Sequence, residues 1–299
     1  MKNVIDKHTI YHKETEGMQM NNGNRTIQKI VTGINTMDGA GVKLVRVFGH
    51  NDTKEFDPFL MLDAFDSTNP DDYTKGFPWH PHRGIETITY LIQGKIEHGD
   101  NLGNKGFILE GDCQWMTAGS GIIHQEMPKP SDRMLGVQLW LNLPSRYKMT
   151  NTKYRAILNN DIPVIEEKGV KAHILSGRYK NQQGAIEADY VKVCYMDVEM
   201  DPDSQWEIDT DIKDNIFIYI LHGEAYFDDD ILVTQKHAIL FNEGEKIKVI
   251  TKEKGARFLF LAGKPLHEPV AWGGPIVMNT NEELNLAFKE LEENTFIKV

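Results

Sequence analysis

Two short stretches decide the fold: Thr89-Tyr90-Leu91-Ile92-Gln93-Gly94 and Ile218-Tyr219-Ile220-Leu221-His222-Gly223. Each is a run of β-branched, aromatic and aliphatic residues that ends near a glycine, which is typical of a strand entering a turn. The two stretches align with one another. Trp115-Met116-Thr117-Ala118-Gly119 aligns with Leu240-Phe241-Asn242-Glu243-Gly244 at a similar offset along the chain. Two matching offsets indicate an internal repeat and predict two copies of one β-domain.

The sequence around these stretches has the same character. From Ile30 to Phe260 it consists mainly of short runs of Val, Ile, Tyr, Phe and Thr, separated by Gly, Asn and Asp. This pattern predicts an all-β fold, either a sandwich or a barrel. The exception is Thr280-Asn281-Glu282-Glu283, a capping box that leads into an apolar run. It predicts a short C-terminal helix from about Asn281 to Glu293.

Length and composition indicate two domains. The chain has 299 residues, of which 40% are hydrophobic, so it can form two apolar cores. Residues 1–24 are polar, and we expect them to form an extension outside the first core. The periodicity fades between Ser145 and Asn160. We therefore expect one domain over 25–148 and a second over 149–299.

Charge and cysteine content exclude several classes of protein. The 33 Lys and Arg residues are outnumbered by 44 Asp and Glu, the formal net charge is −11, and no basic stripe suits a nucleic-acid backbone. Only Cys113 and Cys194 occur, which excludes a disulfide framework within one chain. No signal peptide or transmembrane run is visible. We expect a cytoplasmic protein that binds neither nucleic acid nor membrane.

Two segments carry metal-ligand side chains at strand spacing: His80-Pro81-His82 and His124-Gln125-Glu126. Residues i and i+2 of a strand lie on the same face, so each pair would point into one interior. Pro81 holds His80 in an extended conformation. Neutral imidazole and ionised carboxylate are costly to bury without a partner, and together they bind first-row divalent ions. The two pairs predict a metal site in the first domain.

Spacing does not identify the carboxylate of this site. Glu86 lies four residues after His82 and would share its face on a regular strand, so it competes with Glu126. The repeat limits the number of sites, since its offsets align Asp209 with His80 and Val249 with His124. We therefore predict one ion per chain and a second domain that has lost its metal.

These residues and several other segments resemble a known family, the pirins, which are proteins of two cupin domains. The similar segments are Asp57–Asp63, Phe77–Thr87, Gly111–Gly119, His124–Pro128, Gln138–Pro144 and Pro275–Thr280. The resemblance covers roughly Arg25 to the C-terminus. It implies two tandem cupin barrels, each a double-stranded β-helix or jelly roll, followed by the short helix.

The resemblance also implies the ligand set, which is His80, His82, His124 and Glu126. It favours Glu126 over Glu86, which would then have a structural role or orient a ligand histidine by a hydrogen bond. Family members usually carry iron, so we expect one Fe(II) ion per chain. The same ligands also accept Mn, Co, Ni, Cu or Zn.

Two functions follow from the resemblance. Some members open the heterocyclic ring of quercetin-like flavonols with O₂, and Glu126 would then be the base that takes the substrate's proton. Others are metal- or redox-dependent regulators that bind a protein partner without catalysis. We expect the first, a quercetin 2,3-dioxygenase-like oxidoreductase. The candidate walls for a flat aromatic substrate flank the ligands, and they are Phe77, Trp79, Trp115, Met116 and Met127.

Overall fold

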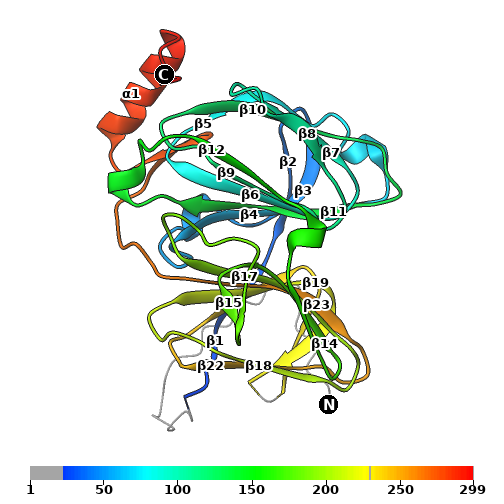
Figure 1. The fold of residues 1–299 in the computed structure, drawn as a ribbon. Coiled ribbons are helices and arrows are strands. Elements are labelled where there is room, and N and C mark those ends of the chain that lie inside the picture. The colour runs from blue at the N-terminus through cyan, green and yellow to red at the C-terminus, as the bar shows by residue number, and fades with distance from the viewer. Residues whose placement is uncertain (1–22, 229, 299) are drawn as a thin grey trace.

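The computed structural model describes residues 23–228 and 230–298. Two β-rich domains are stacked on one another, and a single α-helix, α1 (Asn281–Glu292), projects beside the first of them (Figure 1). The predicted all-β fold of two barrels with a short C-terminal helix is confirmed. Of the predicted N-terminal extension, residues 1–22 lie outside the described residues.

The first barrel is made of two sheets that face each other. The larger has seven strands in the order β12-β9-β6-β11-β4-β3-β2, and the smaller has four in the order β5-β10-β7-β8. Their bounds are β2 (Ile34–Asp38), β3 (Val42–Phe48), β4 (Phe59–Ser67), β5 (Phe77–His82), β6 (Ile85–Gln93), β7 (Ile96–Asp100), β8 (Lys105–Ile108), β9 (Cys113–Thr117), β10 (Ile122–Pro128), β11 (Met134–Asn142) and β12 (Lys153–Ile157). Short 3-10 turns occur at His50–Asp52, Pro70–Asp72, Ser145–Tyr147 and Asn159–Asp161.

The second barrel is built from one ten-stranded sheet. Its main path is β1-β21-β19-β23-β17-β14-β13, while β18, β20 and β22 pair off this path. The bounds are β1 (Ile27–Thr32), β13 (Val164–Glu167), β14 (Val170–Ser176), β17 (Val193–Met200), β18 (Gln205–Asp209), β19 (Asn215–Phe227), β20 (Ile231–Thr234), β21 (His237–Phe241), β22 (Lys246–Ile250) and β23 (Ala256–Gly263). Two small hairpins complete the fold, β15 (Arg178–Tyr179) with β16 (Gln182–Gln183) and β24 (Ala271–Gly273) with β25 (Ile276–Met278).

Some strands lie in a different barrel from the one that their position in the sequence predicts. Strand β12 pairs with β9 in the first barrel, so the first sheet runs past the predicted division at residues 148 and 149. Strand β1 pairs with β21, which places the start of the described chain in the second barrel. After β23 the chain returns to the first barrel, where the Val277 amide donates to the Arg83 carbonyl oxygen at 3.1 Å. These pairings join residues far apart in sequence, so local patterns cannot reveal them.

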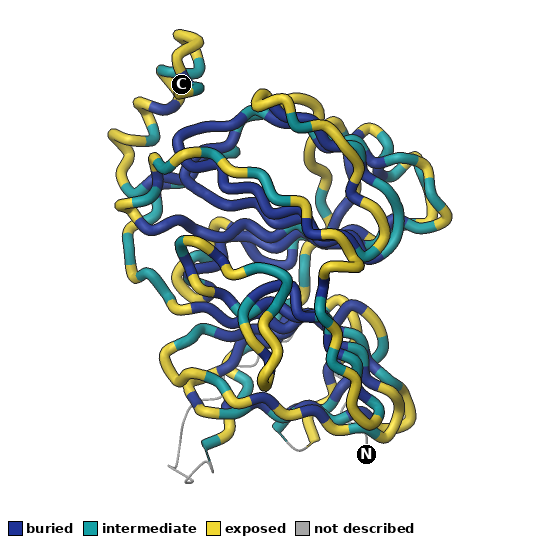
Figure 2. The backbone as a smooth tube through the Cα atoms, viewed as in Figure 1, coloured by how far each residue is buried: buried dark blue, intermediate teal, exposed yellow. Residues whose placement is uncertain are grey.

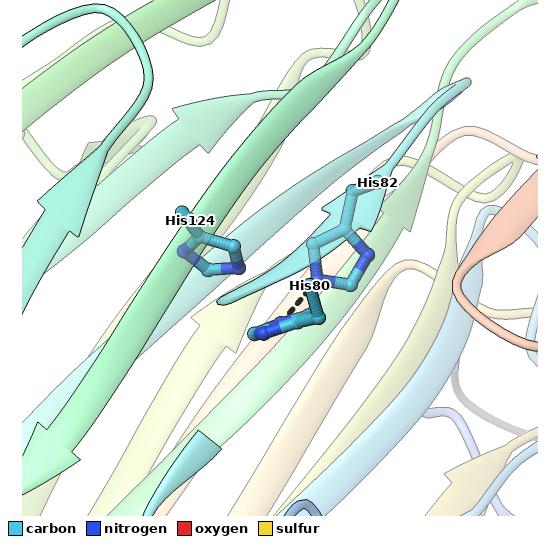
Figure 3. Close-up of side chains that lie close together, drawn as sticks. All are labelled: His80, His82 and His124. Carbon is cyan, nitrogen blue, oxygen red and sulfur yellow. Dashed lines mark hydrogen bonds between the residues drawn. The ribbon is translucent and has the colours of Figure 1, made fainter. Parts of the chain in front are cut away.

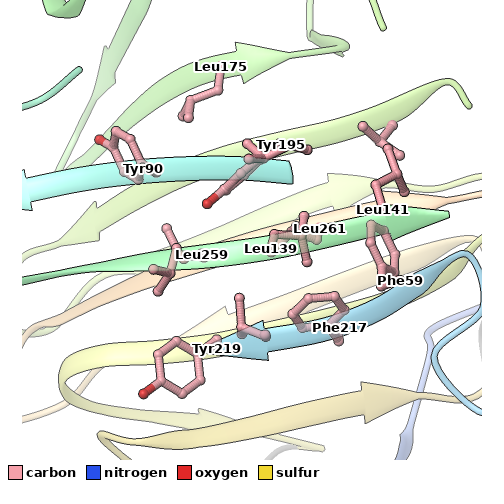
Figure 4. Close-up of a cluster of buried hydrophobic side chains, with 14 of the residues drawn as sticks. Phe59, Tyr90, Leu139, Leu141, Leu175, Tyr195, Phe217, Tyr219, Leu259 and Leu261 are labelled. Carbon is pink, nitrogen blue, oxygen red and sulfur yellow. The ribbon is translucent and has the colours of Figure 1, made fainter. Parts of the chain in front are cut away.

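An extensive apolar cluster lies between the two barrels (Figure 4). In β6 the side chains alternate: Ile88 and Tyr90 belong to this cluster, while Thr89 points into the first barrel and bonds to a residue of β10. The second barrel contributes Tyr195 and Phe217. The strands on either side of the interface are buried along much of their length (Figure 2). Both barrels therefore depend on each other for part of their apolar burial.

Helix α1 begins at the predicted capping box. The Thr280 hydroxyl accepts from the Glu283 amide at 3.2 Å, and the Glu283 carboxylate accepts from the Thr280 amide at 3.0 Å. Ala287 packs with Phe296 beneath the helix, against Ile276. No helix within residues 23–228 and 230–298 has both the length and the apolar character needed to cross a membrane.

Candidate metal centre

Three histidines converge inside the first barrel, in the position that strand spacing predicted. Strands β5 and β10 are antiparallel neighbours, and their register sets His124 directly opposite His80. One ligand nitrogen from each of His80, His82 and His124 lies within 4.8 Å of the others. The three rings gather beside one another (Figure 3). His82 and His124 are fully buried, whereas His80 is partly exposed.

The hydrogen bonds of His80 and His82 leave two lone pairs facing each other. His80 Nδ1 lies 2.9 Å from the Pro78 carbonyl oxygen, and His82 Nδ1 lies 3.1 Å from that of Pro275. A carbonyl oxygen only accepts, so each Nδ1 carries the proton and each Nε2 has a free lone pair. The two Nε2 atoms are 3.1 Å apart (Figure 3). A cation between them would relieve their repulsion.

His124 supplies an independent sign of the same kind. Both of its ring nitrogens are buried without a hydrogen-bond partner among the described residues. Burial, together with His82 and His80, moves its pKa well below the ordinary value, and burial lowers the pKa of His82 to about 3. Neutral imidazoles are the form that binds a metal ion. The three side chains therefore fit a divalent metal.

Glu126 lies on the same face of β10 as His124 but outside the group of nitrogens described above. Its carboxylate reaches the opposite sheet. It accepts from the Thr89 hydroxyl at 2.9 Å, from Gln114 Nε2 at 3.2 Å and from Gln138 Nε2 at 2.8 Å. Three neutral donors thus fix the position of the carboxylate inside the barrel. Its part as a metal ligand stays a prediction.

Glu86 lies on the other side of β6, away from the histidines. Gly84 interrupts the chain between His82 and Glu86 with a φ of +77°, and a Cβ there would lie 2.0 Å from the Val277 carbonyl oxygen. Beyond this turn Glu86 pairs with Thr117, whose hydroxyl donates to it at 2.6 Å. Burial raises the pKa of Glu86. The shared face assumed from spacing requires a regular strand, and the turn at Gly84 removes it.

The five candidate wall residues occupy three different environments. Phe77 lines a narrow cavity that also touches Glu126, and Met116 is buried inside the first barrel. Trp115 belongs instead to the cluster between the barrels, because it alternates with Met116 along β9. Trp79 is 53% exposed, and Met127 is on the face of β10 opposite Glu126. Phe77 and Met116 alone are near the interior of the barrel.

Three further polar residues, His98, Asp100 and Tyr154, form a connected group next to His124 and were not anticipated. His98 lies opposite Glu126 in the β7–β10 pairing, and its ring centroid is 5.7 Å from that of His124. It stacks on Tyr154 at 4.8 Å, and its Nε2 lies 3.4 Å from Asp100. Burial raises the pKa of Tyr154 to about 12. The signal was present: His98-Gly99-Asp100 repeats the ligand-x-ligand spacing.

The corresponding place in the second barrel is filled by apolar side chains. The β18–β22 register sets Trp206 opposite Val249, where the repeat alignment had placed Asp209. Trp206 packs against Phe258 and Phe260 at ring distances of 5.4 and 5.6 Å. Asp209 is 91% exposed and lies on the outside. The two offsets therefore disagree with the strand register, which sets Trp206, and not Asp209, opposite Val249.

Comparison with known proteins finds relatives over most of the chain. The pirin family model matches residues 41–141, and the model of the pirin C-terminal cupin domain matches residues 195–297. A Pseudomonas aeruginosa protein, named only provisionally as a quercetin 2,3-dioxygenase, is 41% identical over 278 residues, which cover 90% of this chain and 97% of the relative. A pirin-like protein of Caulobacter vibrioides is 40% identical over 275 residues, covering 91% of this chain and 99% of the relative.

A solved structure gives the same result. The crystal structure of a quercetin 2,3-dioxygenase from Acinetobacter baumannii superimposes with a TM-score of 0.85 and 30% sequence identity. The match covers 91% of this chain and 98% of that chain. The similarity therefore extends over both barrels and is not limited to the histidine-bearing one.

Proposed function

The chain belongs to the pirin family, and from this premise we propose that it is a metal-dependent dioxygenase that opens the ring of quercetin-like flavonols with O₂. The metal is held by His80, His82 and His124, with Glu126 as the fourth ligand and Fe(II) as the expected ion. The observation that carries the proposal is the convergence of the three imidazoles, in which the Nε2 atoms of His80 and His82 face each other and both ring nitrogens of His124 have no hydrogen-bond partner among the described residues. The names of two relatives supply the reaction class.

The residues around the centre suit this reaction. A bound divalent ion would supply a Lewis acid that acidifies the flavonol hydroxyl and brings it close to O₂. Glu126 accepts the hydroxyl proton as a general base. The donors on Thr89, Gln114 and Gln138 hold the Glu126 carboxylate in place for that step. Loss of the hydroxyl proton makes the flavonol ring electron-rich, which favours its reaction with O₂.

Access to the centre is from the side of His80. A cavity of about 20 Å³ lies against Glu126 and is walled mainly by apolar side chains, among them Phe65 and Phe77. That volume holds no more than about one water molecule. We therefore place the flavonol next to the partly exposed His80. The Phe77 ring, whose centroid is 6.5 Å from that of His80, would then lie beside the flat face of the flavonol.

Burial of the ligands fits a centre that acts on small molecules. His82 and His124 are only 2% and 0% exposed, so direct contact with the ligands is limited to molecules that enter the barrel. Small molecules such as O₂ and a planar phenol can reach a centre of this kind.

The test is oxygen uptake by protein loaded anaerobically with Fe(II) and supplied with quercetin, combined with detection of released carbon monoxide. The proposal predicts that both signals depend on quercetin and are lost in His124→Ala. The matched control is His222→Ala, which removes an exposed histidine of the second barrel. Iron-loaded protein that consumes no O₂ with any flavonol overturns the proposal.

A further inference from the structure

The chain after β23 leaves the second barrel and ends against the metal-binding strand of the first. Pro275, Glu290 and Phe296, here called the C-terminal clamp, contact His82 and its neighbour Arg83. We propose that the clamp positions His82 and thereby controls how long the metal is retained. The inference rests on the proposed metal centre and extends it to residues outside the ligand set.

The first contact acts directly on a ligand. The Pro275 carbonyl oxygen accepts from His82 Nδ1 at 3.1 Å. This bond fixes the proton on Nδ1 and turns the Nε2 lone pair toward His80. Pro275 is 193 residues away from His82 along the chain. The orientation of this ligand in the first barrel therefore depends on a segment that follows the second barrel.

The second contact acts through Arg83, which follows His82. The Arg83 side chain is only 2% exposed, and its guanidinium is paired with Glu290 of α1 at 2.7 Å. It donates to the Phe296 carbonyl oxygen at 2.7 Å, and its Cζ lies 4.1 Å from the centre of the Phe296 ring. A buried guanidinium needs this full set of partners. Loss of one of them frees the backbone next to His82.

The same guanidinium connects the two metal-binding strands. Arg83 Nε donates to the Ser120 carbonyl oxygen at 2.7 Å, in the turn that leads into β10 and His124. Phe296 also packs against that turn, because a Cβ on Gly121 would lie 3.0 Å from its ring. The clamp therefore holds the ends of β5 and β10 in register from one side.

The base of the clamp is secured by a buried lysine. Lys148 Nζ donates to the Gly84 carbonyl oxygen at 2.8 Å and to the Val277 carbonyl oxygen at 3.0 Å. One side-chain nitrogen thus ties the turn after His82 to the returning segment. Ligands held by such outer contacts bind metal about 10 to 100 times more tightly than ligands without them.

The experiment measures how fast bound Ni(II) passes from the full-length protein to an excess of chromogenic chelator, well below the melting temperature. Glu290→Gln removes the ion pair with Arg83, and Phe296→Leu removes the ring above it while keeping an apolar side chain. The matched control is Glu292→Gln, the same chemical change on an exposed position of the same helix. The melting temperature of each metal-free protein is measured alongside.

We expect both clamp variants to release Ni(II) about 10-fold faster than the wild type and Glu292→Gln to release it at the wild-type rate. Wild-type rates in both clamp variants overturn the inference, even if their metal-free forms melt at lower temperature, because the clamp is then merely structural. If the wild type itself retains no Ni(II), the proposed metal centre fails, and this inference fails with it.

Discussion

The Nε2 atoms of His80 and His82 lie 3.1 Å apart, although each ring already uses its Nδ1 proton on a backbone carbonyl. Folding therefore brings two acceptors together inside the barrel. Such an arrangement is unfavourable without a cation and favourable with one. The third histidine, His124, stands beside them with both ring nitrogens free among the described residues.

Glu126→Gln and Glu86→Gln should differ in metal content. Glu126 shares a face with His124, whereas Glu86 faces Thr117 on the other side of β6. We expect Glu126→Gln to lose roughly half or more of its metal, because a neutral amide is a poor ligand. Glu86→Gln should keep the wild-type amount. Elemental analysis of the two purified proteins measures their metal content. Equal losses of metal would mean that Glu86 is as much a ligand as Glu126.

Gln138→Leu should reduce turnover without removing the metal ligands. Gln138 Nε2 donates to one Glu126 carboxylate oxygen at 2.8 Å, so the substitution leaves the base less firmly held. We expect kcat for quercetin to fall about 10-fold with little change in KM. Gln125→Leu is the control, because Gln125 alternates with Glu126 and lies on the outer face of β10. Equal kcat values for the two variants would contradict the role given to Gln138.

Arg257→Met should destabilise the interface between the barrels. Asp197 is fully buried there, accepts from the Tyr90 hydroxyl at 2.7 Å and is paired with the Arg257 guanidinium at 2.6 Å. Removing the cation leaves a buried carboxylate without its charge partner, which costs about 3 kcal/mol of unfolding free energy. Urea denaturation of the variant and the wild type measures this difference in unfolding free energy.

The control for this change is Lys254→Met, which breaks the pair with Glu224 on the surface, where Lys254 is 67% exposed. Exposed pairs contribute between about 0 and 1 kcal/mol. If Arg257→Met loses no more stability than Lys254→Met, the buried network does not hold the barrels together.

The sequence located the three histidines because their geometry is local. Residues two apart on a strand share a face, and Pro81 keeps His80 extended, so both pairs could be read directly. The same rule failed for Glu86, since the turn at Gly84 ends one strand before the next begins. Spacing rules hold only while the strand is continuous.

The remaining features depend on contacts between distant parts of the chain. Tyr154 reaches the first barrel because β12 pairs with β9, although the periodicity had faded before it. The hydrogen bond between Pro275 and His82 joins residues that are 193 positions apart in the sequence, so local patterns cannot predict it. The repeat alignment was sound for the strands but shifted at Trp206, where short stretches carry too little information to fix register.

Lys148 should give the fold a pH dependence of known sign. Burial lowers its pKa from 10.5 to about 7, so the folded protein releases this proton at lower pH than the unfolded chain does. Between those values the unfolded state binds more protons, and stability rises with pH by up to about 1.4 kcal/mol per unit. Below pH 7 both states are protonated and the gain is absent.

The pH dependence is measured as the difference in unfolding free energy between the wild type and Lys148→Met, by urea denaturation from about pH 6 to about pH 9. Subtracting the variant removes the contributions of all other titrating groups. The difference should move in favour of the wild type as the pH rises. A difference that stays flat over this range would mean that Lys148 keeps its charge in the fold.

The central claim is that one metal ion lies between the three histidines, and anomalous diffraction from a crystal of the metal-loaded protein tests it most directly. We predict a single peak about 2.0–2.1 Å from the Nε2 atoms of His80 and His82 and from a ring nitrogen of His124. A crystal with no peak at that position, or with its only peak in the second barrel, would contradict the account.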